Sequence, residues 1–281
     1  MQLLRIAAFS DGETGGNPAG VAIAGTLPPE SSMQRIAAEV GYSETAFAAP
    51  LGDRRWRVRY FAPEIEVPFC GHATIALGAV LALRCGDGVF PLQLNSGAIS
   101  VEGRAGDDGL FAALQSPPTH SAAAPRGLIK DALALFGYTD DDLDPRLPPA
   151  RMHAGADHLL LALMSRQRLA AMSYNFSHGR ALMADAGLTT IALIYARDPQ
   201  TFDARNAFAV GGVVEDPATG AAAGALAGYL RDLQWPHCGS ITIIQGEDMG
   251  CRSILRADIP EPAGSSIRVS GAARSITAPA P

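Results

Sequence analysis

The sequence predicts an α+β protein made of two similar halves, each a curved sheet around a central helix. Three observations predict this fold. The chain has 281 residues, which suggests about two domains. Short apolar segments typical of strands outnumber the helical patterns. Two small-residue helical segments, 68–81 and 217–230, also match each other at an offset of 149 residues (217 − 68).

Periodicity and turn residues predict the elements of the first half. A helix is expected over 31–41, because its apolar residues fall on one face; Ser31 or Ser32 can cap it and Gly41 ends it. Apolar runs bounded by turn residues predict strands at 3–9, 21–24, 42–47, 55–61, 91–95, 98–102 and 109–114. The glycine-rich segment between the first two strands matches no phosphate-binding pattern and is interpreted as a tight loop.

The second half contains a long loop followed by strands and helices. Residues 138–151 are rich in Asp and Pro and predict that loop. Helices are expected at 127–136, 178–187 and 221–230. Strands are expected at 158–163, 189–195, 240–245, 252–256 and 266–270.

Composition and charge exclude several functional classes. Apolar residues make up 48% and charged residues 18%, as in ordinary globular proteins. The balance of 22 basic and 28 acidic residues gives a net charge of −6, so neither nucleic acid nor a membrane surface is an expected partner. Lys130 is the only lysine and no glycine-rich phosphate loop precedes it, which argues against Schiff-base and Walker-type enzymes.

The sequence gives no sign of export, membrane insertion or metal binding. The longest uncharged apolar stretches are too short and too rich in glycine to span a bilayer. The four cysteines have no C-x-x-C spacing, so free thiols in a cytoplasmic protein are the simplest interpretation. His153 and His158 are too far apart and lack the neighbours of a metal site, so no metal is predicted.

One carboxylate in the first half could be catalytic or simply exposed. In the strand predicted over 42–47, alternation places Glu44 on one face with Tyr42 and Ala46. A carboxylate in that setting lies either at an exposed sheet edge or on a pocket wall, and the pattern alone leaves both interpretations open.

The two matched helical segments predict a site for an anion. The first turn of a helix presents backbone N–H groups and a partial positive charge, which together stabilise a carboxylate. Gly71 and Gly220 let a ligand approach these backbones closely. Two such helix ends facing each other across a cleft would place His72 and Asp216 beside the bound molecule.

Five blocks of the chain together resemble the phenazine-biosynthesis PhzF-like family, which belongs to the diaminopimelate-epimerase-like superfamily. They are GGNPAGV at 15–21, SETAF at 43–47, CGHAT at 70–74, EDPATG at 215–220 and QGEDMG at 245–250. The resemblance implies two pseudo-symmetric domains, each a barrel-like, mostly antiparallel sheet wrapped around a central helix. We expect these domains at 1–118 and 119–281, with the last strand able to return to the first domain.

The resemblance also implies a function. It predicts an isomerase that needs neither metal nor organic cofactor and moves a proton on a small carboxylate substrate by acid–base catalysis, in a homodimer. The matching positions are Glu44 as the proton-transferring carboxylate, with His72 and Asp216 beside it. The residues that would hold the substrate are Gly71, Ala73, Thr219, Gly220 and Ala221.

Two departures from the family keep alternative functions open. Ala221 replaces the serine that follows Thr-Gly in the enzyme that names the family, so one hydroxyl is missing. Cys70 lies where related epimerases carry one of two catalytic thiols, but Thr219 is its counterpart in the repeat. The alternatives are an amino-acid racemase or epimerase that uses Cys70, and a non-catalytic protein that binds a small carboxylate.

Overall fold

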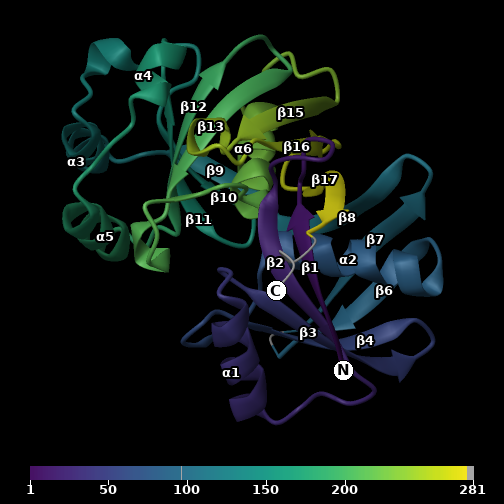
Figure 1. The fold of residues 1–281 in the computed structure, drawn as a ribbon. Coiled ribbons are helices and arrows are strands. Elements are labelled where there is room, and N and C mark those ends of the chain that lie inside the picture. Colours follow the sequence, from purple (N-terminus) through teal and green to yellow (C-terminus); the bar gives the residue numbers. More distant parts are fainter. Residues whose placement is uncertain (96, 277–281) are drawn as a thin grey trace. The chain divides into compact units, whose positions relative to one another are not determined.

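The computed structural model describes residues 1–95 and 97–276, and the contacts between residues group the chain into two units. Unit 1 contains Met1–Gln115 and the segment that begins at Ser270, and unit 2 contains Ser116–Val269. The last strand, β17 (Ser266–Ser275), therefore begins in unit 2 and ends in unit 1. Figure 1 shows the elements of both units in chain order.

Unit 1 is a mostly antiparallel sheet. Its other strands are β1 (Gln2–Ala8), β2 (Asn17–Ile23), β3 (Thr45–Gly52), β4 (Arg55–Phe61), β5 (Glu66–Val67), β6 (Gly88–Gln93), β7 (Ala98–Gly106) and β8 (Gly109–Pro118). They pair in the order β17–β1–β2–β3–β4–β6–β7–β8, with β5 added to β4, and the pairing of β8 with β17 closes the sheet into a barrel. The two parallel steps, β2–β3 and β4–β6, are connected through α1 (Glu30–Val40) and α2 (Gly71–Cys85).

Helix α2 is the central helix of unit 1, as the small-residue pattern predicts. Every residue from His72 to Ala82 is buried, and the helix packs against β2 and β7. Glycine is required where α2 meets β7: a Cβ on Gly103 would lie 2.1 Å from the carbonyl oxygen of Gly78. The small residues therefore let the sheet close tightly around the helix.

Unit 2 is built in the same way. Its strands are β9 (His120–Ala123), β10 (Ala150–His153), β11 (Asp157–Ala162), β12 (Thr190–Ala196), β13 (Thr201–Ala207), β14 (Glu215–Asp216), β15 (Ser240–Gln245) and β16 (Ser253–Asp258). They pair in the order β9–β10–β11–β12–β13–β15–β16, with β14 added to β13 and parallel steps at β11–β12 and β13–β15. The helices are α3 (Arg126–Phe136), α4 (Arg166–Ala170), α5 (Phe176–Asp185) and α6 (Gly220–Asp232).

Helices lie on both faces of the sheet of unit 2. Helices α3, α4 and α5 lie on one side of strands β11–β13, where residues such as Leu133, Met183 and Leu193 form a core (Figure 1). Helix α6 is buried from Ala222 to Arg231 and packs against β9, β10 and β16. Among the described residues, no helix combines the length and the hydropathy needed to cross a membrane.

The order of elements confirms the internal repeat. Each unit contains an antiparallel pair, a parallel step, a second antiparallel pair, a two-residue strand, a buried helix and a second parallel step. The two-residue strands start at Glu66 and Glu215 and the buried helices start at Gly71 and Gly220. Both pairs of positions differ by 149 residues, the offset expected from the sequence.

Three local predictions are wrong. Glu44 does not lie within a strand: it precedes β3, and its carbonyl accepts the Gly20 N–H at 3.1 Å. Helix α1 starts at Glu30 after Pro29, without a side-chain cap, so neither Ser31 nor Ser32 caps it. Strand β10 begins at Ala150, inside the predicted loop.

Strand β13 is absent from the predictions because charged residues interrupt its apolar pattern. Asp203 and Arg205 are both buried in this strand. Each is paired with an opposite charge, Asp203 with Arg197 and Arg205 with Glu215. Pairing offsets the cost of burying a charge, but a hydrophobicity pattern cannot register it.

Candidate active site

The beginning of α2 gathers four polar side chains, Ser43, Glu44, Cys70 and His72, which we call half-site 1. The His72 ring lies at its centre. Its Nε2 atom is 3.4 Å from Glu44 Oε2 and 3.3 Å from Ser43 Oγ. Its Nδ1 atom is 3.3 Å from Cys70 Sγ. One imidazole therefore contacts a carboxylate, a hydroxyl and a thiol.

Hydrogen bonds at the N-cap hold half-site 1 in place. Cys70 is the extended N-cap residue of α2, and its carbonyl accepts the Thr74 hydroxyl at 2.7 Å. Tyr60 lies 2.7 Å from the same hydroxyl and donates to it, because the Thr74 proton is already used. Burial raises the pKa of Tyr60, so this phenol stays a neutral donor.

The exposure of the two ionisable groups suits proton transfer. The Glu44 side chain is 17% exposed and that of His72 is 7% exposed. The carboxylate can therefore reach a ligand while the imidazole stays behind it to orient it or relay a proton. Ser43 was not among the predicted site residues, because strand alternation put it on the face opposite Glu44.

Half-site 1 also has the donor atoms of a metal site. Glu44, Cys70 and His72 each offer one oxygen, sulfur or nitrogen atom, and these three atoms lie within 4.8 Å of one another. Zn²⁺ accepts such a mixed set. A metal test of this protein must therefore include this cluster.

The beginning of α6 forms the equivalent structure in unit 2, which we call half-site 2. It contains Asp216, Thr219, Gly220, Ala221 and Gln245. Thr219 is the extended N-cap residue, and its hydroxyl donates to Asp216 Oδ2 at 2.6 Å. This contact fixes the Asp216 carboxylate beside the first turn of the helix.

Gln245, the last residue of β15, holds half-site 2 together. Its Oε1 atom accepts the Thr219 N–H at 3.1 Å, and its Nε2 atom donates to the Asp216 carbonyl at 2.6 Å. The Gln245 side chain is buried, and its hydrogen bonds go to the loop 216–219 and to Asn206. Gln245 begins the QGEDMG block, which carries part of the family resemblance. The resemblance did not indicate that the Gln245 side chain binds Thr219 and Asp216.

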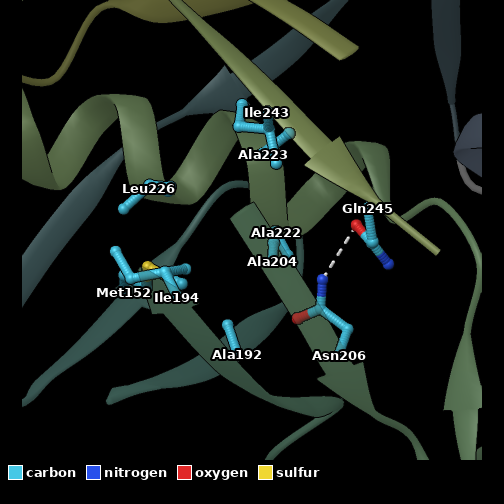
Figure 2. Close-up of a pocket in the computed structure, with 10 residues that line it drawn as sticks. All are labelled: Met152, Ala192, Ile194, Ala204, Asn206, Ala222, Ala223, Leu226, Ile243 and Gln245. Atoms are coloured by element: carbon cyan, nitrogen blue, oxygen red, sulfur yellow. Dashed lines mark hydrogen bonds between the residues drawn. The ribbon is translucent and has the colours of Figure 1, made fainter. Parts of the chain in front are cut away.

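A buried polar chain continues from Gln245 across the sheet of unit 2. Asn206 Nδ2 donates to Gln245 Oε1 at 3.1 Å (Figure 2). Thr190 donates to Asn206 Oδ1 at 3.3 Å, and His158 Nδ1 lies 2.7 Å from the same Thr190 hydroxyl. Since the hydroxyl proton is used, His158 Nδ1–H donates to Thr190. The chain links four neighbouring strands, β11, β12, β13 and β15.

His158 is a neutral member of this chain. Burial lowers its pKa from 6.5 to about 4. Within the described part of the chain, its Nε2 atom has no hydrogen-bond partner. His158 is therefore an uncharged hydrogen-bond donor to Thr190 within the sheet.

A cavity beneath α6 meets the same polar chain. Asn206 and Gln245 form its polar corner, and the rest of its lining is apolar, including Ala192, Ile194 and Leu226 (Figure 2). These apolar residues belong to the core of unit 2. The cavity is therefore a packing gap behind half-site 2, unsuited to a polar substrate.

Both helices present backbone donors at the predicted positions. The first intrahelical bonds are donated by Thr74 in α2 and by Ala223 in α6. The N–H groups of Gly71 and Ala73, and those of Gly220 and Ala221, precede these bonds and lie in the region of positive helix dipole. Thr219 lies immediately before Gly220 as the N-cap, so every predicted site residue lies at one of the two helix starts.

Comparisons with known proteins agree with this architecture. The family model for phenazine biosynthesis-like proteins matches residues 6–278. An uncharacterized isomerase of Deinococcus radiodurans is 34% identical over 237 residues, covering 80% of this chain and 74% of that protein. Trans-2,3-dihydro-3-hydroxyanthranilate isomerase of Pseudomonas fluorescens is 30% identical over 276 residues, covering 97% and 95%.

Solved structures show the same fold. A predicted epimerase of Pseudomonas aeruginosa superposes with a TM-score of 0.84 at 24% identity, covering 98% of this chain and 96% of that one. A protein described as a probable proline racemase from Agrobacterium radiobacter superposes with a TM-score of 0.64 at 11% identity, covering 98% of this chain and 90% of that one. The match of the family model across nearly the whole chain, with isomerases among its relatives, shows that this protein is an isomerase of the phenazine biosynthesis-like family.

Proposed function

We propose that the protein is a cofactor-independent isomerase that moves a proton between two atoms of a small carboxylate, with Glu44 as the proton carrier. The observation that carries the proposal is the 3.4 Å contact between Glu44 Oε2 and His72 Nε2 at the start of α2. A carboxylate beside an imidazole, at a helix end that favours negative charge, suits abstraction of a proton from carbon.

The proposed step needs no other reactant. Glu44 takes a proton from one substrate carbon, and the electron pair of the broken C–H bond moves into the conjugated system of the substrate. Glu44 then returns the proton to a second carbon of that system. His72 orients the carboxylate, and the backbone N–H groups of Gly71 and Ala73 stabilise the negative charge that develops.

Half-site 2 is proposed to bind the substrate carboxylate. The N–H groups of Gly220 and Ala221 would hold the carboxylate, and Asp216 an amino or hydroxyl group. The Pseudomonas fluorescens relative is named for a dihydro-hydroxyanthranilate, which is such a carboxylate. Ala221 supplies no hydroxyl, so we propose the broader class of cyclic or amino-acid-like carboxylates.

Deuterium exchange tests the proposal. The protein is incubated in D₂O with a panel of small carboxylates, including cyclic dienes and amino acids, and uptake into carbon is followed by NMR. We expect uptake that Glu44→Gln abolishes while calorimetry still detects binding. Glu39→Gln is the matched control, because Glu39 is an exposed carboxylate whose ion pair, among the described residues, is with Arg35 in α1. Uptake that persists in Glu44→Gln would refute the assignment.

A second candidate is a racemase or epimerase that uses Cys70. It is favoured by the 3.3 Å contact between Cys70 Sγ and His72 Nδ1 at the helix N-cap, the setting in which protein thiols react as thiolates. It predicts that Cys70→Ser loses exchange and that bound ligand protects wild type from iodoacetamide. Cys85→Ser is the control for alkylation of an exposed thiol. Exchange that survives in Cys70→Ser assigns the chemistry to Glu44.

The third reading, a carboxylate-binding protein without catalysis, predicts tight binding of a panel member with no uptake at any pH. The absence of a hydroxyl at Ala221 is the observation behind it.

We also propose that the protein works in the cytoplasm as a homodimer. None of the four cysteines forms a disulfide, which agrees with a reducing compartment. Sedimentation equilibrium tests the dimer.

A further inference from the structure

We propose that His120, His153 and Asp157 form a binding site for a divalent transition-metal cation such as Zn²⁺ on unit 2, which we call the His–His–Asp cluster. Each residue offers one donor atom, and the three atoms lie within 4.8 Å of one another. Two imidazole nitrogens and a carboxylate oxygen are a donor set that Zn²⁺ uses with water as a further ligand. This site is separate from the two helix starts and from the proposed isomerisation.

Strand register brings the three residues together. His120 on β9 lies directly opposite His153 on β10, and His153 lies directly opposite Asp157 on β11. Residues directly opposite each other on neighbouring antiparallel strands project from the same face of a sheet. The cluster is thus a row across three strands, set by backbone pairing.

The side chains have already converged. The rings of His120 and His153 are stacked, with centroids 4.5 Å apart and planes 20° from parallel. His153 Nδ1 lies 3.1 Å from Asp157 Oδ1. Ligands bound to Zn²⁺ at about 2.0–2.1 Å in a tetrahedron are roughly 3.4 Å apart. Small side-chain rotations therefore suffice to place all three donors around one ion.

The backbone beneath the cluster is held firmly on both sides. Thr119, next to His120, accepts the buried Arg231 guanidinium at 2.6 Å through its hydroxyl and donates its N–H to the Gly264 carbonyl. Gly155, in the turn between His153 and Asp157, has a φ of +91°, and a Cβ there would lie 2.9 Å from Pro117 Cγ. The turn is therefore packed against the segment that leads to His120, so little ordering is needed when a cation binds.

Exposure leaves room for the cation and its water ligands. His120 is exposed, and the side chains of His153 and Asp157 are 26% and 45% exposed. A surface ion pair between His153 and Asp157 would account for those two residues alone. It does not account for the second imidazole, which is stacked on the first. A bound cation requires both rings neutral and uses both.

The proposal is tested by titrating chelator-treated protein with ZnCl₂ and measuring the heat of binding by calorimetry. We expect the signal from this cluster to weaken at least about tenfold in His120→Ala and in Asp157→Asn, since each loses one of three protein ligands. His178→Ala, which removes an exposed histidine in α5, is the matched control and should bind like wild type. Circular dichroism without metal verifies that each variant is folded.

A second arm separates this cluster from half-site 1, whose Glu44, Cys70 and His72 could also take Zn²⁺. Titration is repeated in Cys70→Ser, and Co²⁺ replaces Zn²⁺ so that a thiolate ligand reveals itself by its charge-transfer absorption. We expect Cys70→Ser to bind the cation as wild type does. In the Co²⁺ titration, the binding that His120→Ala abolishes should give a spectrum without a thiolate band. Zinc affinity unchanged in both His120→Ala and Asp157→Asn, or no zinc binding at all, would overturn the proposal.

Discussion

The side-chain oxygen of Gln245 accepts the backbone N–H of Thr219 at 3.1 Å, so the end of strand β15 positions the N-cap of helix α6. The amide also holds the Asp216 carbonyl and the Asn206 side chain. The loop of half-site 2 therefore depends on Gln245, a residue of the neighbouring strand, for its geometry.

We expect Gln245→Met to weaken both the fold and the proposed substrate site. It leaves the Thr219 N–H, the Asp216 carbonyl and the Asn206 amide without this partner, which costs about 3 kcal/mol in total. In urea unfolding the variant should lose that stability, and KM should rise more than kcat falls because binding depends on the loop. Gln93→Met, at the exposed end of the corresponding strand β6, is the control. A variant as stable as wild type would show that the loop holds itself.

His158 should make unfolding depend on pH in mild acid. Its pKa is 6.5 in the unfolded chain and about 4 in the fold, so the unfolded state binds more protons between these values. Stability should therefore fall as pH drops from 6.5 towards 4, by about 3 kcal/mol at most from this residue. His158→Gln should flatten the pH profile of urea unfolding, and equal slopes in the two proteins would contradict the assignment.

Gly103→Ala should disrupt unit 1, whereas Gly106→Ala in the same strand should not. A Cβ on Gly103 would lie 2.1 Å from the backbone oxygen of Gly78, which cannot move without shifting α2. A Cβ on Gly106 has no neighbour within 4 Å among the described residues. We expect a loss of about 3 kcal/mol or more for the first and less than about 0.5 kcal/mol for the second. Thermal unfolding of both variants measures the difference.

We expect unit 2 to lose stability when one partner of the Arg205–Glu215 ion pair is removed. Both side chains are more than nine-tenths buried, and Arg205 also donates to the Ala170 carbonyl at 2.8 Å. Glu215→Gln leaves a buried guanidinium without its counter-charge, which should cost about 3 kcal/mol. Glu39→Gln breaks an exposed pair and should cost less than about 1 kcal/mol. Similar losses in the two variants, measured by urea unfolding, would disprove this account.

The repeat, and with it the fold class, was open to prediction because small residues recur along two helices. The position of Glu44 beside His72 was harder to predict. Its pattern indicated a strand, whereas its contact with His72 joins segments far apart in the chain, and only the family resemblance paired them.

Contacts across strands could not be predicted, because the sequence of one strand does not specify which residues of a neighbouring strand lie opposite it. The sequence drew attention to His153 and His158 together, but they occupy different strands, and His158 is buried against Thr190. The neighbours of His153 are His120 and Asp157, and β9, which carries His120, is too short to show an apolar pattern. Gln245 was missed for the same reason.

The pairing of Ala7 with Arg274 has a consequence for the order in which the chain can assemble. Strand β1 leaves the ribosome before unit 2 is made, but the residues of β17 that pair with it follow Val269, the last residue of unit 2. Unit 2 can thus gather its core during synthesis, while β1 keeps an open edge towards β17 until the end. Closing such a long loop is a slow, late event. The unpaired edge of β1 is therefore exposed to aggregation while unit 2 is being made.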